Sequence, residues 1–354
     1  MNKLSILADE NIAHLDDYFG NFNLIKLKGR DITQAAIDAH NPDALLIRSV
    51  TPINAGTITN TKNIRFVGTA TIGTDHVDTN FLNSHGICFA NAKGSSKHSV
   101  AQYVITALLT KNPNLLHQKI TLGIIGLGNI GSTLASYAHD LHWHVLGFDP
   151  YLAQSDINNS TFDELLATSD IISIHTPLTK TGEYPTHQLF DQACFDKIKD
   201  HATLINTARG EIINQTALIN AIDDKHLDAI LDVFPHEPSI DKSLLDKLTI
   251  ATPHIAGYTL DGKLRGTDMT YQAFCQYFGL PITQTLDGIL PHNPHHWQKL
   301  KVSLYDNPDM LSTYYDILSD DMALRNACTD QVLGTDFDRL RKDYLLKREW
   351  IYAS

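Results

Sequence analysis

The chain has 354 residues, of which 43% are hydrophobic and 19% charged, and its formal net charge is −12. That length exceeds one ordinary compact core, so we expect a globular protein of two or three domains. The negative charge argues against nucleic acid or an anionic membrane as a partner, because both carry charge of the same sign. From the acidic N-terminus and the lack of an apolar run of roughly 20 residues, we expect neither a signal peptide nor a membrane span.

The number and spacing of the cysteines indicate the redox compartment of the protein. The four cysteines are far apart in the sequence and form no CxxC pair: Cys88, Cys194, Cys275 and Cys328. Such spacing disfavours a zinc site or a disulfide framework and is typical of a reducing cytoplasm. We therefore expect a cytoplasmic protein with no metal.

In the first 95 residues, short β-rich runs alternate with helical stretches. The buried strands are predicted over 3–9, 43–49, 64–70 and 86–91. Alternation of this kind is typical of parallel βαβ units. The segment 97–110 predicts a long helix that leads into a second domain.

The second domain begins at residue 119, and helical patterns separate its strands. Six strands are predicted, over 119–125, 144–149, 170–176, 202–208, 229–234 and 248–253. This spacing predicts a doubly wound parallel sheet. A helix is predicted over 261–279 and a charged helix over 339–350, the latter in a turn-rich appendage of different character that begins at residue 280.

A glycine pattern, Gly126-Leu-Gly128-Asn-Ile-Gly131, joins the first strand of this domain to a helix. Gly126 permits the tight turn, Gly128 lets the backbone approach a pyrophosphate, and Gly131 allows close packing of helix on strand. The helix N-terminus offers unpaired N–H groups to the phosphates. At the end of the next strand, Asp149 is placed to bind the adenosine ribose and to repel a 2′-phosphate. The pattern predicts binding of NAD rather than NADP.

Three polar residues, Arg209, Glu237 and His254, come shortly after predicted strands, at the sheet edge where ligands bind in doubly wound folds. Each one alone is typical of a surface ion pair or a loop. Together they suit oxidation of a 2-hydroxy acid. Imidazole is a base for the hydroxyl proton at neutral pH, and a glutamate fixes its tautomer. An arginine fork holds a planar carboxylate.

A family resemblance rests on GLGNIG with Asp149, NTARG, DVFPHEP and TPHIAG. Over most of its length the chain resembles the D-isomer-specific 2-hydroxyacid dehydrogenases. The resemblance implies an α/β fold with a doubly wound NAD-binding domain and a flavodoxin-like substrate domain. It also implies that Arg209, Glu237 and His254 are the active-site residues, with the histidine as the acid/base, and that NAD accepts the hydride.

The resemblance implies further contacts, position by position. Substrate would be bound by Ser49, Thr71 and Tyr258. NAD would be bound by Gly126, Gly128, Asn129, Ile130, Gly131, Asp149, Thr176, Thr207, Ala208, Asp232 and Gly257. The chain departs from the family pattern at Ser95 and Ser96, where GCN is expected, and at Gln102, where a glutamate is usual.

Segments such as ADENI (8–12) and FDRLRKDYLLKREW (337–350) resemble a branch of the family that acts on a small phosphorylated hydroxy acid. This resemblance implies three domains and a homodimer. A discontinuous substrate-binding (lid) domain is expected over 1–95 and 256–279. The NAD-binding domain follows over 96–255, and a small α+β dimerisation domain over 280–354.

A dianionic substrate phosphate requires local positive charge, because the catalytic residues have no spare cation. Arg48 is the preferred candidate, since it ends a predicted strand next to Ser49. Lys347 and Arg348 form a second candidate pair, which would reach the site in the same or the partner subunit. The alternative is that these residues are solvated surface charges.

Two other functions remain open. A relative that acts on a shorter phosphorylated hydroxy acid shares the DVFPxEP segment, although the basic C-terminal segment argues against it. A protein of another class, an NAD-sensing binding protein on the same fold, is compatible with an intact set of active-site residues. An assay of NADH formation separates these alternatives.

Overall fold

The computed structural model describes residues 3–352, which form two compact units. The first unit consists of the N-terminal residues up to Ser96 together with Thr259–Asn293. The second consists of Lys97–Tyr258 together with the chain from Pro294 onward. The C-terminal segment therefore packs within the unit that carries the glycine pattern, whereas the sequence suggests a separate domain from residue 280.

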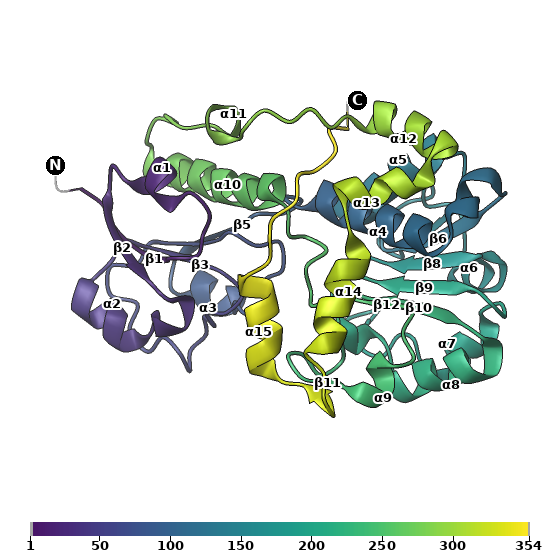
Figure 1. Ribbon diagram of the computed structural model, residues 1–354. Coiled ribbons are helices and arrows are strands. Elements are labelled where there is room, and N and C mark those ends of the chain that lie inside the picture. The colour runs from purple at the N-terminus through teal and green to yellow at the C-terminus, as the bar shows by residue number, and fades with distance from the viewer. Residues whose placement is uncertain (1–2, 353–354) are drawn as a thin grey trace. The chain divides into compact units, whose positions relative to one another are not determined.

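A five-stranded parallel sheet forms the centre of the first unit, in the order β2-β1-β3-β4-β5 (Figure 1). This is the flavodoxin-like order that the family resemblance implies. The strands are β1 Ser5–Asp9, β2 Asn23–Leu27, β3 Ala44–Ile47, β4 Phe66–Thr69 and β5 Cys88–Asn91. Four of them coincide with predicted strands. The edge strand β2 is not predicted, because its half-exposed sequence NLIKL lacks the apolar run of a buried strand.

The helices of the first unit are α1 Leu15–Phe19, α2 Gln34–His40, α3 Thr79–Ser84, α10 Leu260–Phe278 and α11 Leu286–Ile289. The longest, α10, agrees with the predicted helix over 261–279 and packs on β4 and β5. Its buried Phe274 contacts the rings of Phe19 and Phe66 edge to face. Aromatic contacts of this geometry add stability beyond the area they bury. The helix thereby joins chain beyond residue 258 to the N-terminal sheet.

The second unit contains a six-stranded parallel sheet in the order β12-β10-β9-β8-β6-β7 (Figure 1). All six predicted strands are confirmed: β6 Thr121–Ile125, β7 His144–Phe148, β8 Ile171–Ile174, β9 Thr203–Asn206, β10 Asp228–Leu231 and β12 Ile250–Ala251. The order reverses between β6 and β8, so the carboxyl ends of these strands open the crevice in which such folds bind ligands. The glycine pattern follows β6 directly.

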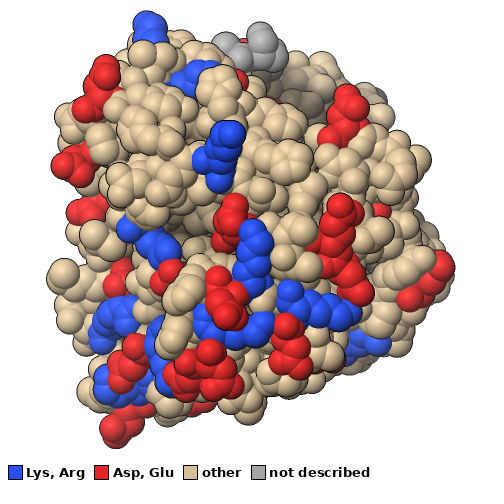
Figure 2. All heavy atoms as spheres, turned by 90° about the vertical axis from the view of Figure 1, so that its right-hand side faces the viewer, with Lys and Arg blue, Asp and Glu red and all other residues tan. Residues whose placement is uncertain are grey.

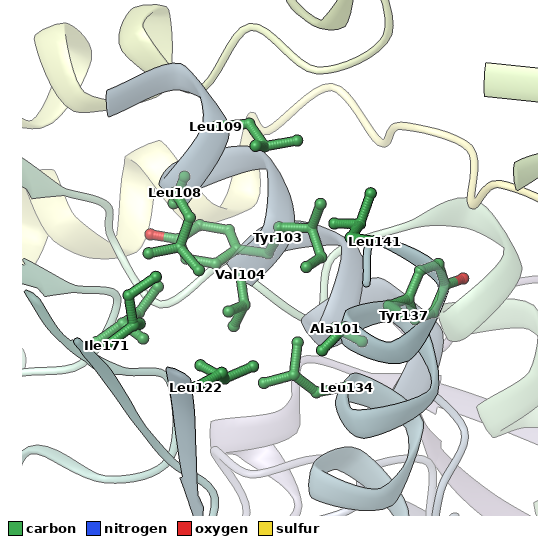
Figure 3. Packing of buried hydrophobic residues seen from close by; sticks show 14 of the residues in the cluster. Ala101, Tyr103, Val104, Leu108, Leu109, Leu122, Leu134, Tyr137, Leu141 and Ile171 are labelled. Atoms are coloured by element: carbon green, nitrogen blue, oxygen red, sulfur yellow. The ribbon is translucent and has the colours of Figure 1, made fainter. Parts of the chain in front are cut away.

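The helices of the second unit are α4 Lys97–Lys111, α5 Asn129–Asp140, α6 Phe162–Thr168, α7 Gln192–Lys197, α8 Gln215–Lys225 and α9 Lys242–Leu245. The predicted helix over 97–110 is α4, and it lies in the core. Every residue from Ser99 to Leu109 is buried. Figure 3 shows Tyr103, Val104 and Leu108 of this helix among apolar side chains of the sheet and of α5.

The C-terminal segment adds α12 Trp297–Asp306, α13 Leu311–Tyr314, α14 Ile317–Asn326 and α15 Gly334–Lys342 to this unit. It also supplies β13 Gln331–Val332, which pairs antiparallel with β11 Ile240–Asp241. Trp297 is fully buried, and its ring stacks on that of Trp350 with centroids 5.3 Å apart. These contacts anchor both ends of the segment in the core of the second unit.

The predicted helix over 339–350 is wrong beyond Lys342, where α15 ends. The backbone of Trp350 bonds instead to the buried side chain of Gln102. The Trp350 N–H donates to Gln102 Oε1 at 2.8 Å, and Gln102 Nε2 donates to the Trp350 carbonyl at 2.9 Å. These long-range bonds replace the bonds of a helix, which sequence-local patterns cannot reveal. They also give a reason for glutamine at position 102, since a carboxylate cannot donate.

Charges of both signs are mixed on the surface that Figure 2 draws. Ion pairs recur in the second unit, for example Lys197 with Asp163 and Lys199 with Asp170. The face drawn therefore presents no unmixed basic area of the kind that binds nucleic acid. Within residues 3–352, no helix has the length and apolar character needed to cross a lipid bilayer.

Candidate active site

The structure brings Glu237 and His254 together in the second unit. His254 Nδ1 lies 2.8 Å from Glu237 Oε2, and the other carboxylate oxygen accepts the Phe234 N–H at 2.8 Å. The side chains are 32% and 23% exposed for the histidine and the glutamate respectively, so solvent and ligands reach them. With Nδ1 donating to the glutamate, Nε2 is the nitrogen that remains for a substrate proton.

The backbone of His254 has φ 55°, in the left-handed region that non-glycine residues seldom adopt. Asp232, which is 1% exposed at the end of β10, holds this turn. Its carbonyl accepts the His254 N–H at 2.8 Å, and its carboxylate accepts the N–H groups of Ile255 and Ala256. Its carboxylate also accepts a bond from the Thr252 hydroxyl at 2.6 Å. The structure therefore gives Asp232, predicted to contact NAD, the task of positioning the histidine loop.

The pKa values of the two carboxylates are shifted in opposite directions. Burial opposes ionisation of Glu237, but the charge and hydrogen bond of His254 and the Phe234 N–H outweigh it, so the pKa of Glu237 is lowered. In contrast, burial raises the pKa of Asp232 to about 6, against the hydrogen bonds it accepts. The hydrogen bond between the ionised glutamate and the histidine orients the imidazole ring.

Arg209 follows β9, the neighbour of β10 in the sheet. The fully buried Asn206 shapes its turn by donating to the Arg209 carbonyl at 2.8 Å and accepting the Ala208 N–H at 2.9 Å. The half-buried guanidinium donates to the Ala208 carbonyl at 2.7 Å. Because parallel strands end at one edge, Arg209 lies at the same edge of the sheet as the loop of His254.

The glycine pattern has the geometry that a dinucleotide site requires. Gly126 has φ 88°, and a Cβ there would come within 2.8 Å of the His175 carbonyl carbon. A Cβ on Gly131 would clash with the Gly126 carbonyl oxygen at 2.0 Å, so helix and strand pack closely. Nothing lies within 4 Å of a Cβ built on Gly128, the N-cap of α5, so the backbone beside Asn129 and Ile130 faces open space.

The side chains around this turn also suit NAD. Asp149 follows β7 and is half-buried, and its Oδ2 accepts the Leu127 N–H at 3.0 Å from the glycine turn. The hydroxyls of Thr176 after β8 and Thr207 after β9 are buried without a hydrogen-bond partner in the described chain. Buried polar atoms are normally paired, so a bound ligand would supply the hydrogen-bond partners that these hydroxyls lack. Ala208 and Gly257 are half-buried at the same sheet edge.

The first unit holds three of the predicted substrate residues. Ser49 is exposed beyond β3, and the Thr71 hydroxyl beyond the adjacent β4 lies 2.8 Å from that of Thr69. Arg48 has a different partner from the one expected. Its Nε and Nη2 donate to the fully buried carboxylate of Asp9 at 2.9 and 3.3 Å. The Arg48 guanidinium therefore already forms a salt bridge within the first unit, which weakens the case for Arg48 as the phosphate ligand.

The basic C-terminal segment supplies a contact that the sequence does not predict. Tyr258 accepts a hydrogen bond from Nη2 of Arg341 at 2.9 Å. Lys347 instead pairs with Asp320 at 2.6 Å, and its side chain is 19% exposed. Arg348 lines a surface hollow together with His295 and Tyr314. The sequence does not single out Arg341, because it is one of several basic residues in a basic segment. Only the tertiary fold places it beside Tyr258.

Comparisons with known proteins agree with this geometry. Residues 101–256 match the family described as "D-isomer specific 2-hydroxyacid dehydrogenase, NAD binding domain". The chain is 49% identical to an erythronate-4-phosphate dehydrogenase of Psychrobacter arcticus, over 99% of this chain and 100% of that protein.

Two solved structures show the same fold. D-mandelate dehydrogenase of Rhodotorula graminis has a TM-score of 0.68 at 24% identity, covering 80% of this chain and 97% of that one. An NAD complex of formate dehydrogenase from Staphylococcus aureus has a TM-score of 0.63 at 25% identity, covering 78% of this chain and 96% of that one. The chain therefore belongs to the erythronate-4-phosphate dehydrogenase family within the D-isomer-specific 2-hydroxyacid dehydrogenases, which are NAD-dependent oxidoreductases.

Proposed function

We propose that this enzyme oxidises 4-phospho-D-erythronate at C2 to (R)-3-hydroxy-2-oxo-4-phosphooxybutanoate, a step of pyridoxal 5′-phosphate (vitamin B6) biosynthesis. The observation that carries the chemistry is the bond of 2.8 Å between Glu237 and His254, in the same unit as the dinucleotide turn. Similarity to erythronate-4-phosphate dehydrogenases over nearly the whole chain supports the choice of substrate.

In this proposal His254 takes the proton of the C2 hydroxyl through Nε2, because Nδ1 donates to Glu237. Glu237 remains ionised and stabilises the imidazolium that forms, as its lowered pKa favours. Arg209 holds the substrate carboxylate in two hydrogen bonds and fixes C2 relative to the histidine. Asp232 keeps the histidine loop in its left-handed turn, so the base is oriented before substrate binds.

NAD, when bound, accepts the hydride from C2. Gly126, Gly128 and the first residues of α5 would hold its pyrophosphate, and Asp149 would hold the adenosine ribose. The unpartnered hydroxyls of Thr176 and Thr207 would supply further hydrogen bonds. The substrate contacts proposed for Ser49 and Thr71 rest on their position beyond neighbouring strands of the first unit.

The test is NADH formation by the purified enzyme with three substrates: 4-phosphoerythronate, 3-phosphoglycerate and unphosphorylated erythronate. We expect the highest kcat/KM with 4-phosphoerythronate. A preference for 3-phosphoglycerate would assign the enzyme to the shorter substrate. NAD binding without turnover of any of the three would favour the NAD-sensing protein.

We also propose that the enzyme is a homodimer that associates through its C-terminal segment. Apolar side chains are exposed there, namely Val302, Leu318, Met322 and Leu345 at 62%, 51%, 60% and 86%. Exposed apolar groups that gather on one segment are typical of an interface, and two-fold association is the commonest choice.

The four cysteines are free thiols, which supports a cytoplasmic location.

A further inference from the structure

Arg341 lies in the last turn of α15 and is held by aromatic groups. Its Nη2 donates to Tyr258 Oη at 2.9 Å, and its guanidinium lies over the rings of Tyr258 and Phe337, 5.5 and 5.6 Å from their centroids. Stacking on aromatic faces leaves the edge donors of a guanidinium available, since the ring contacts use its faces. The arginine is thereby oriented without the use of a carboxylate.

The hydrogen-bonding capacity of Arg341 is largely unused. A guanidinium has five N–H donors. Among residues 3–352, the Tyr258 hydroxyl is its one hydrogen-bond acceptor, and its Nε is shielded from solvent without a partner. Buried donors of a charged group are costly to leave unpaired, so such an arrangement points to an anionic ligand.

The position of Arg341 relates it to the catalytic pair. Tyr258 follows His254 by four residues, on the loop that Asp232 holds. Burial raises the pKa of Glu237, and the positive charge of Arg341 adds to the larger lowering effects of His254 and the Phe234 N–H. All of these residues belong to the second unit, so one compact body carries the pair and the cation.

Neighbouring cations of this unit are paired with acids. Lys347 binds Asp320, with a side chain that is 19% exposed. Arg325 binds Asp321 at 2.8 Å and donates to the carbonyls of Leu245 and Leu248. On α15 itself, Arg339 pairs with Asp336. Arg341 differs from these three because its contacts include no salt bridge.

We propose that Arg341, assisted by the Tyr258 hydroxyl, binds the phosphate group of the substrate and so determines the preference for a phosphorylated hydroxy acid. This inference rests on the proposed function. It assigns the role to the C-terminal segment of the same chain, at a residue other than Lys347 and Arg348. Arg209 is left to bind the carboxylate, so the two anionic ends of the substrate have separate arginines.

The experiment compares Arg341→Gln with wild type and with a matched control, Arg339→Gln, which removes an exposed cation from the same helix. Thermal unfolding of each variant checks that it is folded. We expect Arg341→Gln to raise KM for 4-phosphoerythronate by about 10- to 100-fold, the effect of one or two charged hydrogen bonds. The KM of Arg341→Gln for unphosphorylated erythronate should stay near wild type. The KM values of Arg339→Gln for both substrates should also stay near wild type.

Equal losses on both substrates would overturn the inference, because Arg341 would then serve a group that the two share, or the loop of Tyr258. No loss on either substrate would overturn it as well. A second readout uses inorganic phosphate, whose binding by calorimetry should weaken in Arg341→Gln and persist in Arg339→Gln. If wild type does not oxidise 4-phosphoerythronate, the proposed function fails. Unchanged phosphate affinity in Arg341→Gln would then reject the role of Arg341 independently.

Discussion

At the scale of single residues, the site depends on a histidine in a backbone conformation that costs free energy. Left-handed φ at a residue other than glycine costs about 1–3 kcal/mol and persists where surrounding bonds enforce it. Here Asp232 enforces it, through its carbonyl to His254 and its carboxylate to Ile255 and Ala256. The strain is thus sustained by a buried group whose described hydrogen bonds go to the loop backbone and to Thr252, and none to the His254 ring.

Replacement of His254 by glutamine tests the proposed base. The amide keeps a polar group of similar reach but cannot accept the substrate proton, so kcat should fall by at least about 10²-fold. NAD affinity, measured by fluorescence titration, should change little, since the dinucleotide turn is untouched. A rate near that of wild type would remove His254 from the role of base.

Replacement of Glu237 by glutamine should alter the pH dependence of stability. The folded-state pKa of Glu237 lies below its ordinary value of 4.5, so its ionised form stabilises the fold. This contribution is present above pH 4.5 and is lost as pH falls through the lowered pKa. The difference in free energy of unfolding between wild type and variant should therefore shrink on acidification, as urea titrations at several pH values can measure. A difference that grew toward low pH would contradict the pairing.

At the scale of elements, α4 is the part of the second unit to which distant segments attach. Its Tyr103 hydroxyl lies 2.6 Å from that of Thr252, which in turn bonds to Asp232 below the histidine loop. Its Ser99 donates to the buried carboxylate of Glu349 at 2.6 Å. One buried helix therefore supports both the histidine loop and the end of the C-terminal segment.

The Gln102→Glu substitution tests this attachment, and it introduces the residue that the family resemblance leads us to expect. A glutamate at this 3% exposed position cannot donate to the Trp350 carbonyl or to the Tyr137 hydroxyl oxygen, which lie 2.9 and 2.8 Å from Nε2. We expect a loss of about 1–3 kcal/mol in the free energy of unfolding at neutral pH, for an acceptor left unpaired beside a buried charge. Chemical denaturation measures it. Stability equal to wild type would show that the C-terminal segment can repack.

At the scale of the whole molecule, the C-terminal segment combines a buried and an exposed apolar side. Trp297, Leu304 and Leu324 are fully buried in the second unit, whereas Leu318 and Met322 of α14 are more than half exposed. Removal of residues 285–354 would therefore strip the core of that unit as well as any interface. Aggregation after truncation is expected for this reason and says little about association.

A surface variant tests association without loss of core. In Leu318→Lys/Met322→Lys, two exposed apolar groups of α14 acquire charge, which should dissociate a dimer that buries them while leaving the fold intact. Leu152→Lys, at a 47% exposed position outside the segment, is the control. Sedimentation should give dimer for wild type and control and monomer for the double variant. A wild type that sediments as monomer, or a double variant that stays dimeric, would refute this interface.

The sequence by itself determined what depends on local pattern. The strands of both parallel sheets except β2, the glycine turn with Asp149, and the polar residues beyond β9, β10 and β12 follow from periodicity, turn chemistry and motif. Tertiary structure alone decided which partners the charged side chains bind and where the C-terminal segment lies. Arg48 meets Asp9 across 39 positions, Gln102 meets Trp350 across 248, and Arg341 meets Tyr258 across 83. Such partners are set by packing between distant segments, because a charge in a sequence carries no record of what the fold will bring beside it.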